Sequence, residues 1–134
     1  MALTRKEGKP YNHHGIEVQT AYQVIDNFAK YDKKERQAIY YIDTYASKAM
    51  REGGRTNLLN RATESVSSDD FDTYLGLDVI ASNGDQFHKA YEHLVSIKHN
   101  ILNPDFDSSK DESDTNLKEI EVLKYKDWES DEIA

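Results

Sequence analysis

Apolar residues recur at steps of three and four along most of this chain, which is the spacing of one face of an amphipathic α-helix. The pattern predicts helices over residues 16–31, 33–52, 56–65, 69–76 and 85–102. Glycine and polar residues separate these stretches, and glycine is favoured where a helix ends. The sequence therefore predicts an all-α fold, a small single-domain bundle of four to five helices with an acidic C-terminal extension.

Three segments depart from the helical pattern. Residues 1–15 are polar and interrupted by glycine and proline, so we expect a flexible N-terminal segment before a helical domain at 16–103. Residues 77–81 form a short apolar run that suits a strand or an extended buried link. Residues 104–134 are predicted to form an acidic linker, flexible or disordered, that is followed by a C-terminal segment. The apolar anchors of 117–128 predict docking in cis on the same chain or in trans on a partner.

The apolar faces of the predicted helices define the expected core. A chain of 134 residues can bury a modest core without disulfides or a structural metal. The residues that we expect to be buried are Val24, Ile25, Phe28, Ile42, Tyr45, Leu58, Phe71, Leu75, Phe87, Tyr91, Leu94 and Ile101.

Charge is distributed unevenly along the chain. The sequence has 25 acidic and 17 basic residues, for a net charge of −8. Residues 1–61 carry +4, residues 62–103 carry −5 and residues 104–134 carry −7. A strongly acidic protein is repelled by nucleic acid and by anionic lipid, and it is attracted to basic protein surfaces. The gradient therefore favours a protein partner for the acidic C-terminal part.

Composition excludes several classes of protein. The chain has no cysteine, which rules out disulfides, thiol chemistry and thiolate metal sites. It has no apolar run near the ~18–20 residues of a membrane span. A hydrophobic stretch does not follow the basic N-terminal residues, so we expect no secretory signal. These features predict a cytoplasmic protein without a membrane partner, acting in the host cytoplasm if it is viral.

Catalytic and cofactor motifs are absent from the sequence. It contains no G-x-S-x-G nucleophile motif and none of the glycine-rich loops that hold phosphate. His88 and Glu92 are four residues apart on a predicted helix and could share a metal ion, but a third ligand would have to come from elsewhere. His99 is too far along the helix to contribute. We therefore expect no enzyme, no cofactor and no metal site.

The favoured interpretation is a non-enzymatic protein that binds a larger protein or complex. Small acidic domains can occupy the nucleic-acid channel of another protein, because their carboxylates replace phosphates. We expect a small phage-type inhibitor or nucleic-acid mimic that acts on a nucleic-acid-processing complex. The partner-binding residues would be Asp105, Asp107, Asp111, Glu112, Asp114, Glu119, Glu121, Tyr125 and Trp128.

Two alternatives stay open. The protein could be a viral or cellular structural or assembly adaptor subunit, in which the aromatic anchors of the C-terminal segment dock into a neighbour. It could instead bind DNA or RNA through a helix-turn-helix-like corner in the basic region 33–61. That site would use Arg51, Arg55 and Arg61. Homo-oligomer formation is compatible with each interpretation.

Overall fold

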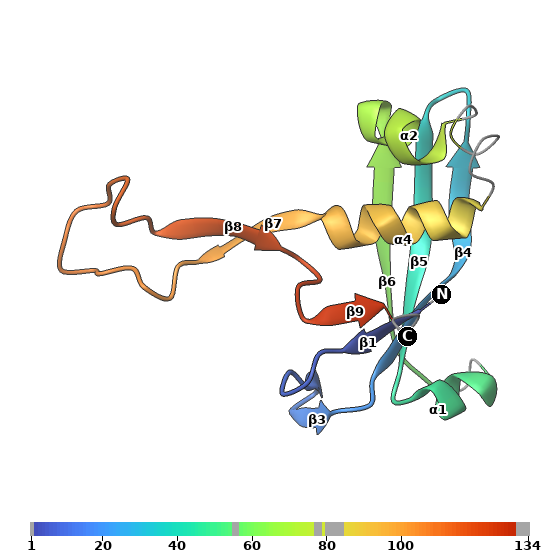
Figure 1. The fold of residues 1–134 in the computed structure, drawn as a ribbon, viewed down its shortest axis with the longest axis horizontal. Coiled ribbons are helices and arrows are strands. Elements are labelled where there is room, and N and C mark those ends of the chain that lie inside the picture. The colour runs from blue at the N-terminus through green and yellow to red at the C-terminus, as the bar shows by residue number, and fades with distance from the viewer. Residues whose placement is uncertain (1, 55–56, 77–78, 80–84, 131–134) are drawn as a thin grey trace.

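The computed structural model describes residues 2–54, 57–76, 79 and 85–130, and it consists mainly of β-strands (Figure 1). The described part contains three helices, namely α1 (Lys48–Glu52), α2 (Ser68–Leu75) and α4 (Gln86–Ser96). Its strands are β1 (Leu3–Arg5), β2 (Tyr11–His13), β3 (Ile16–Val18), β4 (Tyr22–Asp32), β5 (Gln37–Tyr45), β6 (Leu58–Ser67), β7 (Lys98–Leu102), β8 (Glu119–Leu123) and β9 (Trp128–Ser130).

Five of the strands form one antiparallel sheet in the order β6-β5-β4-β1-β9. The long strands β4, β5 and β6 pair with one another along most of their length. The C-terminal strand β9 pairs with the N-terminal strand β1, with Leu3 opposite Ser130. The end of the C-terminal segment therefore docks in cis. Two separate hairpins, β2–β3 and β7–β8, lie outside this sheet.

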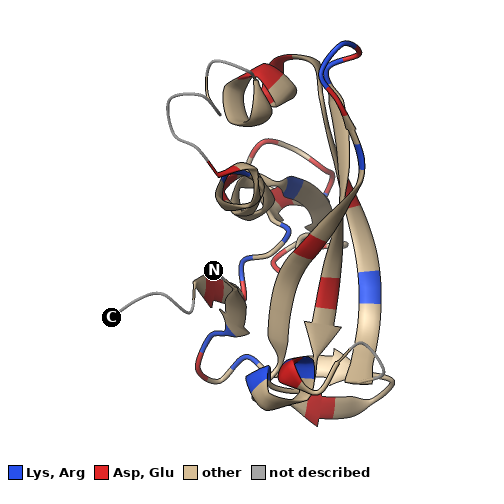
Figure 2. Ribbon diagram, turned by 90° about the vertical axis from the view of Figure 1, so that its right-hand side faces the viewer, with Lys and Arg blue, Asp and Glu red and all other residues tan. Residues whose placement is uncertain are grey.

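Helices α2 and α4 cover one face of the sheet (Figure 2). Side chains alternate between the two faces of a strand, so Ala38, Tyr40 and Ile42 of β5 all point toward these helices. Of the core residues expected from the sequence, eight are buried; the other four, Phe28, Leu58, Phe87 and Ile101, are partly buried. The main cluster consists of Leu3, Ala21, Ile25, Ala38, Tyr40, Ile42, Val66, Phe71, Leu75, Ala90, Tyr91, Leu94 and Trp128.

The prediction of an all-α fold is wrong. The predicted helix at 16–31 forms β3 and most of β4 instead, and irregularities in β4 explain part of the error. The pairing of β4 with β5 shifts register on both sides of Phe28. An extra residue in one strand turns the following side chains over. As a result Ile25, Phe28 and Tyr31 pack on the same core although they are three residues apart. Their partners are two apart on β5, namely Ile42, Tyr40 and Ala38.

The predicted helices at 33–52 and 56–65 are also wrong. The first is a turn followed by β5 and the short helix α1, and the second lies almost entirely within β6. Two residues that are four apart lie on the same face of a helix and also on the same face of a strand. Ala38 and Ile42 are such a pair and therefore fit both structures. The tyrosine, isoleucine and threonine residues of β5 favour a strand, and this propensity was the better guide.

The two remaining helix predictions are confirmed in part. Helix α2 covers most of 69–76. Helix α4 begins as predicted, with the Asp85 carboxylate accepting a hydrogen bond of 2.8 Å from the Phe87 amide, but it ends at Ser96. Residues 98–102 form β7 instead. The run 77–81 falls outside the described residues except for Val79. None of the described helices is long and apolar enough to cross a membrane.

A buried hydrogen bond connects α4 to the sheet. The Tyr40 hydroxyl lies 2.7 Å from Nδ1 of His93, and both residues are buried. Burial lowers the pKa of His93, although Asp70 and Glu64 act in the opposite direction. Burial also raises the pKa of Tyr40. Both side chains are therefore neutral near pH 7, as a hydrogen bond between core residues requires.

Trp128 is 8% exposed and belongs to the main core cluster, so we predict that its loss destabilises the fold. Trp128→Ala should lower the free energy of unfolding by about 3–5 kcal/mol in a denaturant titration. Leu102→Ala, at a side chain that is 71% exposed, is the control and should change it by at most ~0.5 kcal/mol. Equal stability of the two variants would contradict the docking of β9 in cis.

From the burial of His93, we predict that the folded protein becomes less stable in mild acid. The unfolded chain takes up a proton at His93 near the ordinary pKa of 6.5, whereas the folded chain binds it only at lower pH. The free energy of unfolding should therefore fall as the pH drops below about 6.5, by at most ~1.4 kcal/mol per pH unit from this residue. His93→Gln should show a shallower fall in thermal melts across the same pH range. An identical slope in both proteins would exclude His93 as the cause.

Candidate functional site

The most distinctive feature of the molecule is an arm that extends away from the body (Figure 1). The arm consists of β7, β8 and the connecting loop at 103–118. Strand β7 follows α4 almost directly, and β8 returns the chain toward β9. The two strands pair antiparallel from Lys98 opposite Leu123 to Leu102 opposite Glu119. The arm is thus a regular two-stranded hairpin that begins and ends on the body.

The two faces of the arm differ in chemistry. One face presents the opposed pairs Ile101–Ile120 and His99–Val122, and its three aliphatic side chains are only partly buried. None of the three belongs to either hydrophobic cluster of the described residues. The other face carries mainly polar side chains, including Asn100 and Glu121. An isolated two-stranded hairpin is marginally stable in water, so the aliphatic face favours contact with another surface.

The loop at the end of the arm is held by its own hydrogen bonds. Asn116 accepts a bond of 2.9 Å from the Asp107 amide and donates one of 3.0 Å to the Asp107 carbonyl oxygen. At the start of the loop, Asn103 donates to the Leu117 carbonyl oxygen at 2.8 Å. Hydrogen bonds from Ser109 to the Asp107 carboxylate lower the pKa of Asp107. The loop therefore presents charged carboxylates from an ordered backbone.

Glu64 of β6 fixes the root of the arm to the body. Its side chain is 14% exposed and accepts hydrogen bonds from Lys124 Nζ at 2.5 Å and from the Tyr125 hydroxyl at 2.8 Å. The Lys124 amide also donates to the Ile97 carbonyl oxygen at 2.8 Å. Burial and the bond to Glu64 raise the pKa of Tyr125, so its hydroxyl remains a donor. These contacts join both ends of the arm to the edge of the sheet.

The structure separates the partner-binding residues predicted from the sequence into three places. Tyr125 lies at the root of the arm, and Trp128 lies in the core. The acidic members all lie on the arm, either in its loop or on β8, and these are Asp105, Asp107, Asp111, Glu112, Asp114, Glu119 and Glu121.

The residues of the nucleic-acid alternative do not form a helix-turn-helix corner. The Arg61 guanidinium makes two hydrogen bonds of 2.7 and 2.8 Å to the Asp43 carboxylate, which is fully buried. Hydrogen bonding to Asp43 raises the pKa of Arg61. Arg51 lies 3.6 Å from Asp26, and Arg55 lies outside the described residues. Both described arginines are therefore already paired with carboxylates of the same chain.

The described histidine and carboxylate side chains do not assemble a metal site. His88 Nε2 lies 3.5 Å from a Glu92 oxygen, and the same carboxylate binds Lys89 at 3.0 Å. Within the described ranges, no three His, Asp or Glu side chains are placed to hold a metal ion. The contact is thus explained as a local pair on the exposed side of α4.

Sequence reasoning missed the aliphatic face of the arm and the role of Glu64. Residues 119–122 alternate between acidic and aliphatic side chains, which is the pattern of a half-buried strand. This signal identifies β8, but it does not identify β7 as the partner strand. No comparable signal marks Glu64, because its partners are 60 and 61 residues away along the chain.

Comparison with known protein families, curated proteins and solved structures finds no match to this chain.

We predict that Glu64 controls the attachment of the arm. Glu64→Ala leaves the Tyr125 hydroxyl without its acceptor and Lys124 without its carboxylate, at a cost of about 1–3 kcal/mol for the unsatisfied group. Amide hydrogen exchange over 97–125 should become faster, and the core helices should be unaffected. Glu121→Gln, at a carboxylate whose side chain is 62% exposed, is the matched control. Unchanged exchange in Glu64→Ala would show that other contacts hold the arm.

Proposed function

We propose that this protein is a structural or assembly subunit that uses the β7–β8 arm to bind a macromolecular partner. The observation that carries the proposal is the aliphatic face of Ile101, Ile120 and Val122, which projects from the body outside both hydrophobic clusters. This was one of two alternatives to the inhibitor suggested by the sequence. The proposal keeps the expected cytoplasmic location, or the host cytoplasm if the protein is viral.

Exposed leucines on the arm add to this support. Leu102 is 71% exposed, and Leu117 and Leu123 are each exposed by about two fifths. Leu102 and Leu123 lie on the opposite face of the hairpin from Ile101, so both faces of this projecting element expose apolar side chains, as interaction surfaces do. The arm begins and ends on the body, so a partner bound to the arm is connected to the body through two chain segments. These properties suit a subunit that connects neighbours in an assembly.

A non-enzymatic role agrees with the state of the buried polar groups. Catalytic acids and bases need pKa values near the working pH. Burial lowers the pKa of His93 and raises that of Tyr40, which keeps both side chains neutral near pH 7. Their contact is better explained as a hydrogen bond that positions α4 on the sheet.

The inhibitor interpretation has weaker support. A nucleic-acid mimic needs carboxylates in rows that follow the spacing of phosphates on a rigid surface. Here the loop of the arm concentrates five carboxylates at one end of the molecule, and Glu64 is occupied at the root. Capture of a nucleic-acid-processing enzyme, with competition by DNA, would restore this interpretation.

The proposal predicts that binding depends on the arm and not on other exposed apolar residues. A photo-activated cross-linking amino acid at position 102 should give one defined product with a protein at constant stoichiometry. The same group at position 16 is the matched control, since Ile16 is 66% exposed and lies on the separate β2–β3 hairpin. Cross-linked peptides identify the partner and its contact site by mass spectrometry.

A second variant tests the aliphatic face directly. Ile101→Ser with Ile120→Ser should weaken partner binding by at least ~tenfold, because each residue would lose an apolar contact worth about 1–3 kcal/mol. Ile16→Ser with Val95→Ser removes exposed apolar surface elsewhere and should have little effect. Equal capture by the two double variants, with intact circular dichroism, would contradict the proposed function.

A further inference from the structure

We propose that one partner of the arm is a second copy of this chain, and that two arms pair antiparallel around a two-fold axis. This inference rests on the proposed function, because it names a partner for the same surface. In such a pair, the loop of each arm reaches the root of the other. The opposite charges of these two ends and the partly exposed aliphatic face between them support this pairing.

The far end of the arm is negative. The loop at 103–118 contains five carboxylates and two lysines, for a net charge of −3. Four of the five carboxylate residues are exposed, and Asp107 is partly buried. The hydrogen bonds of Asn103 and Asn116 hold the loop in one conformation. The acidic end is thus ordered and concentrated.

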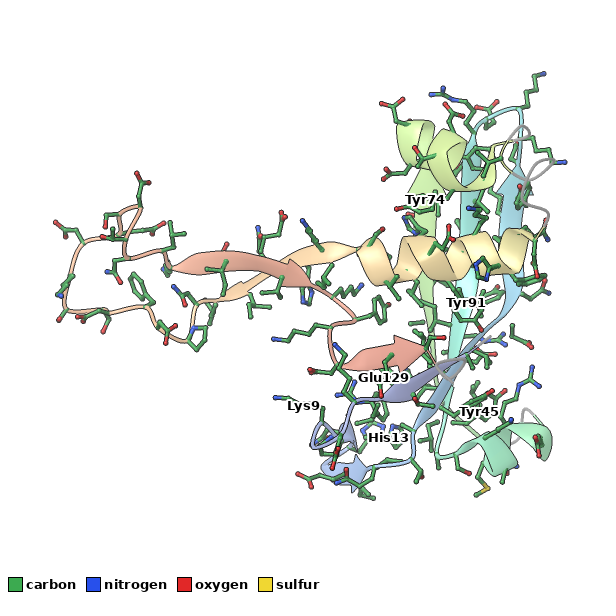
Figure 3. The ribbon with its side chains drawn as sticks, viewed as in Figure 1. Lys9, His13, Tyr45, Tyr74, Tyr91 and Glu129 are labelled. Carbon is green, nitrogen blue, oxygen red and sulfur yellow. The ribbon has the colours of Figure 1, made fainter. Side chains whose placement is uncertain are left out.

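The root of the arm carries one more basic than acidic side chain: Arg5 and Lys124 are paired with Asp127 and Glu64, and Lys6, Lys9 and Lys126 lie near the exposed Glu7 and Glu129. Lys126 lies three residues after the end of β8, and its amide donates to the Leu123 carbonyl oxygen. The Lys6 amide donates to the Asp127 carbonyl oxygen, and the Lys9 amide donates to the Lys6 carbonyl oxygen. Lys9 lies on the N-terminal loop beside this turn (Figure 3). The three lysines are exposed, and none of them forms an ion pair with the described residues.

Antiparallel pairing brings both charged ends of each arm next to opposite charges on the other copy. Strands of five residues separate the root from the loop by roughly 17 Å at ~3.4 Å per residue. A two-fold axis through the middle of two such arms places each acidic loop against the lysines of the other copy. The same arrangement covers the aliphatic side chains between the charged ends. An interface of this type is isologous, so it closes at a dimer.

Charge reversal in two separate proteins provides a sharp test. One protein carries Asp111→Lys and Glu112→Lys in the loop, and the other carries Lys6→Glu and Lys126→Glu at the root. Each protein then has like charges at both ends of its arm. In sedimentation velocity, each alone should dimerise on the order of tenfold more weakly than the unmodified protein. An equimolar mixture should form a heterodimer at least as readily as the unmodified protein dimerises, because each loop again meets an opposite root.

A control reversal has the same change in net charge as the root variant but lies away from the arm. Lys33→Glu with Lys34→Glu alters the β4–β5 turn and should leave dimerisation unchanged. Circular dichroism verifies that all variants are folded, and high salt should weaken the unmodified dimer. The second-copy inference would be overturned if the protein stayed monomeric at every concentration. It would also be overturned if neither charge reversal on the arm changed the strength of dimerisation. Cross-linking from position 102 to a different protein would then test the proposed function independently.

Discussion

The pairing of β9 with β1 is the constraint on which the rest of the structure depends. The chain leaves the body at Ile97 and must return to Trp128, which is buried against the core. Both ends of this excursion are held, by the bond between Ile97 and Lys124 and by the contacts of Glu64. The intervening strands β7 and β8 pair with each other. The result is a hairpin whose direction is set by its root and whose far end is free of the body.

This arrangement gives the acidic segment a different role from that of a flexible tail. Carboxylates on a disordered linker would contribute mainly to solubility and long-range attraction. The structure instead places them on a loop ordered by Asn103 and Asn116, at a fixed direction from a root that carries lysines. Fixed charges of opposite sign at the two ends of one element favour a defined docking geometry. The aliphatic face then contributes the apolar contact area between them.

Two polar pairs within the body have structural explanations. Asp43 is fully buried, and its two bonds to Arg61 supply the partner that a buried carboxylate requires. Tyr40 and His93 connect the sheet with α4 while remaining neutral. These pairs account for groups that would otherwise suggest nucleic-acid binding or acid–base chemistry. Packing within the body does not account for the exposed acidic and apolar side chains of the arm.

The sequence by itself determined much of the burial, the start of α4, the position of α2 and the acidic end of the chain. Apolar side chains such as Ile42 and Leu94 enter the core whichever backbone carries them, and Asp85 caps a helix through local bonds. The sequence did not determine the fold class, because the register shifts in β4 space Ile25 and Phe28 like residues on a helix. Only tertiary structure could decide that Trp128 returns to the sheet, that Arg61 binds Asp43 and that Glu64 fixes the arm. Each of these contacts joins residues far apart in the chain, and their pairing depends on how strands align in space.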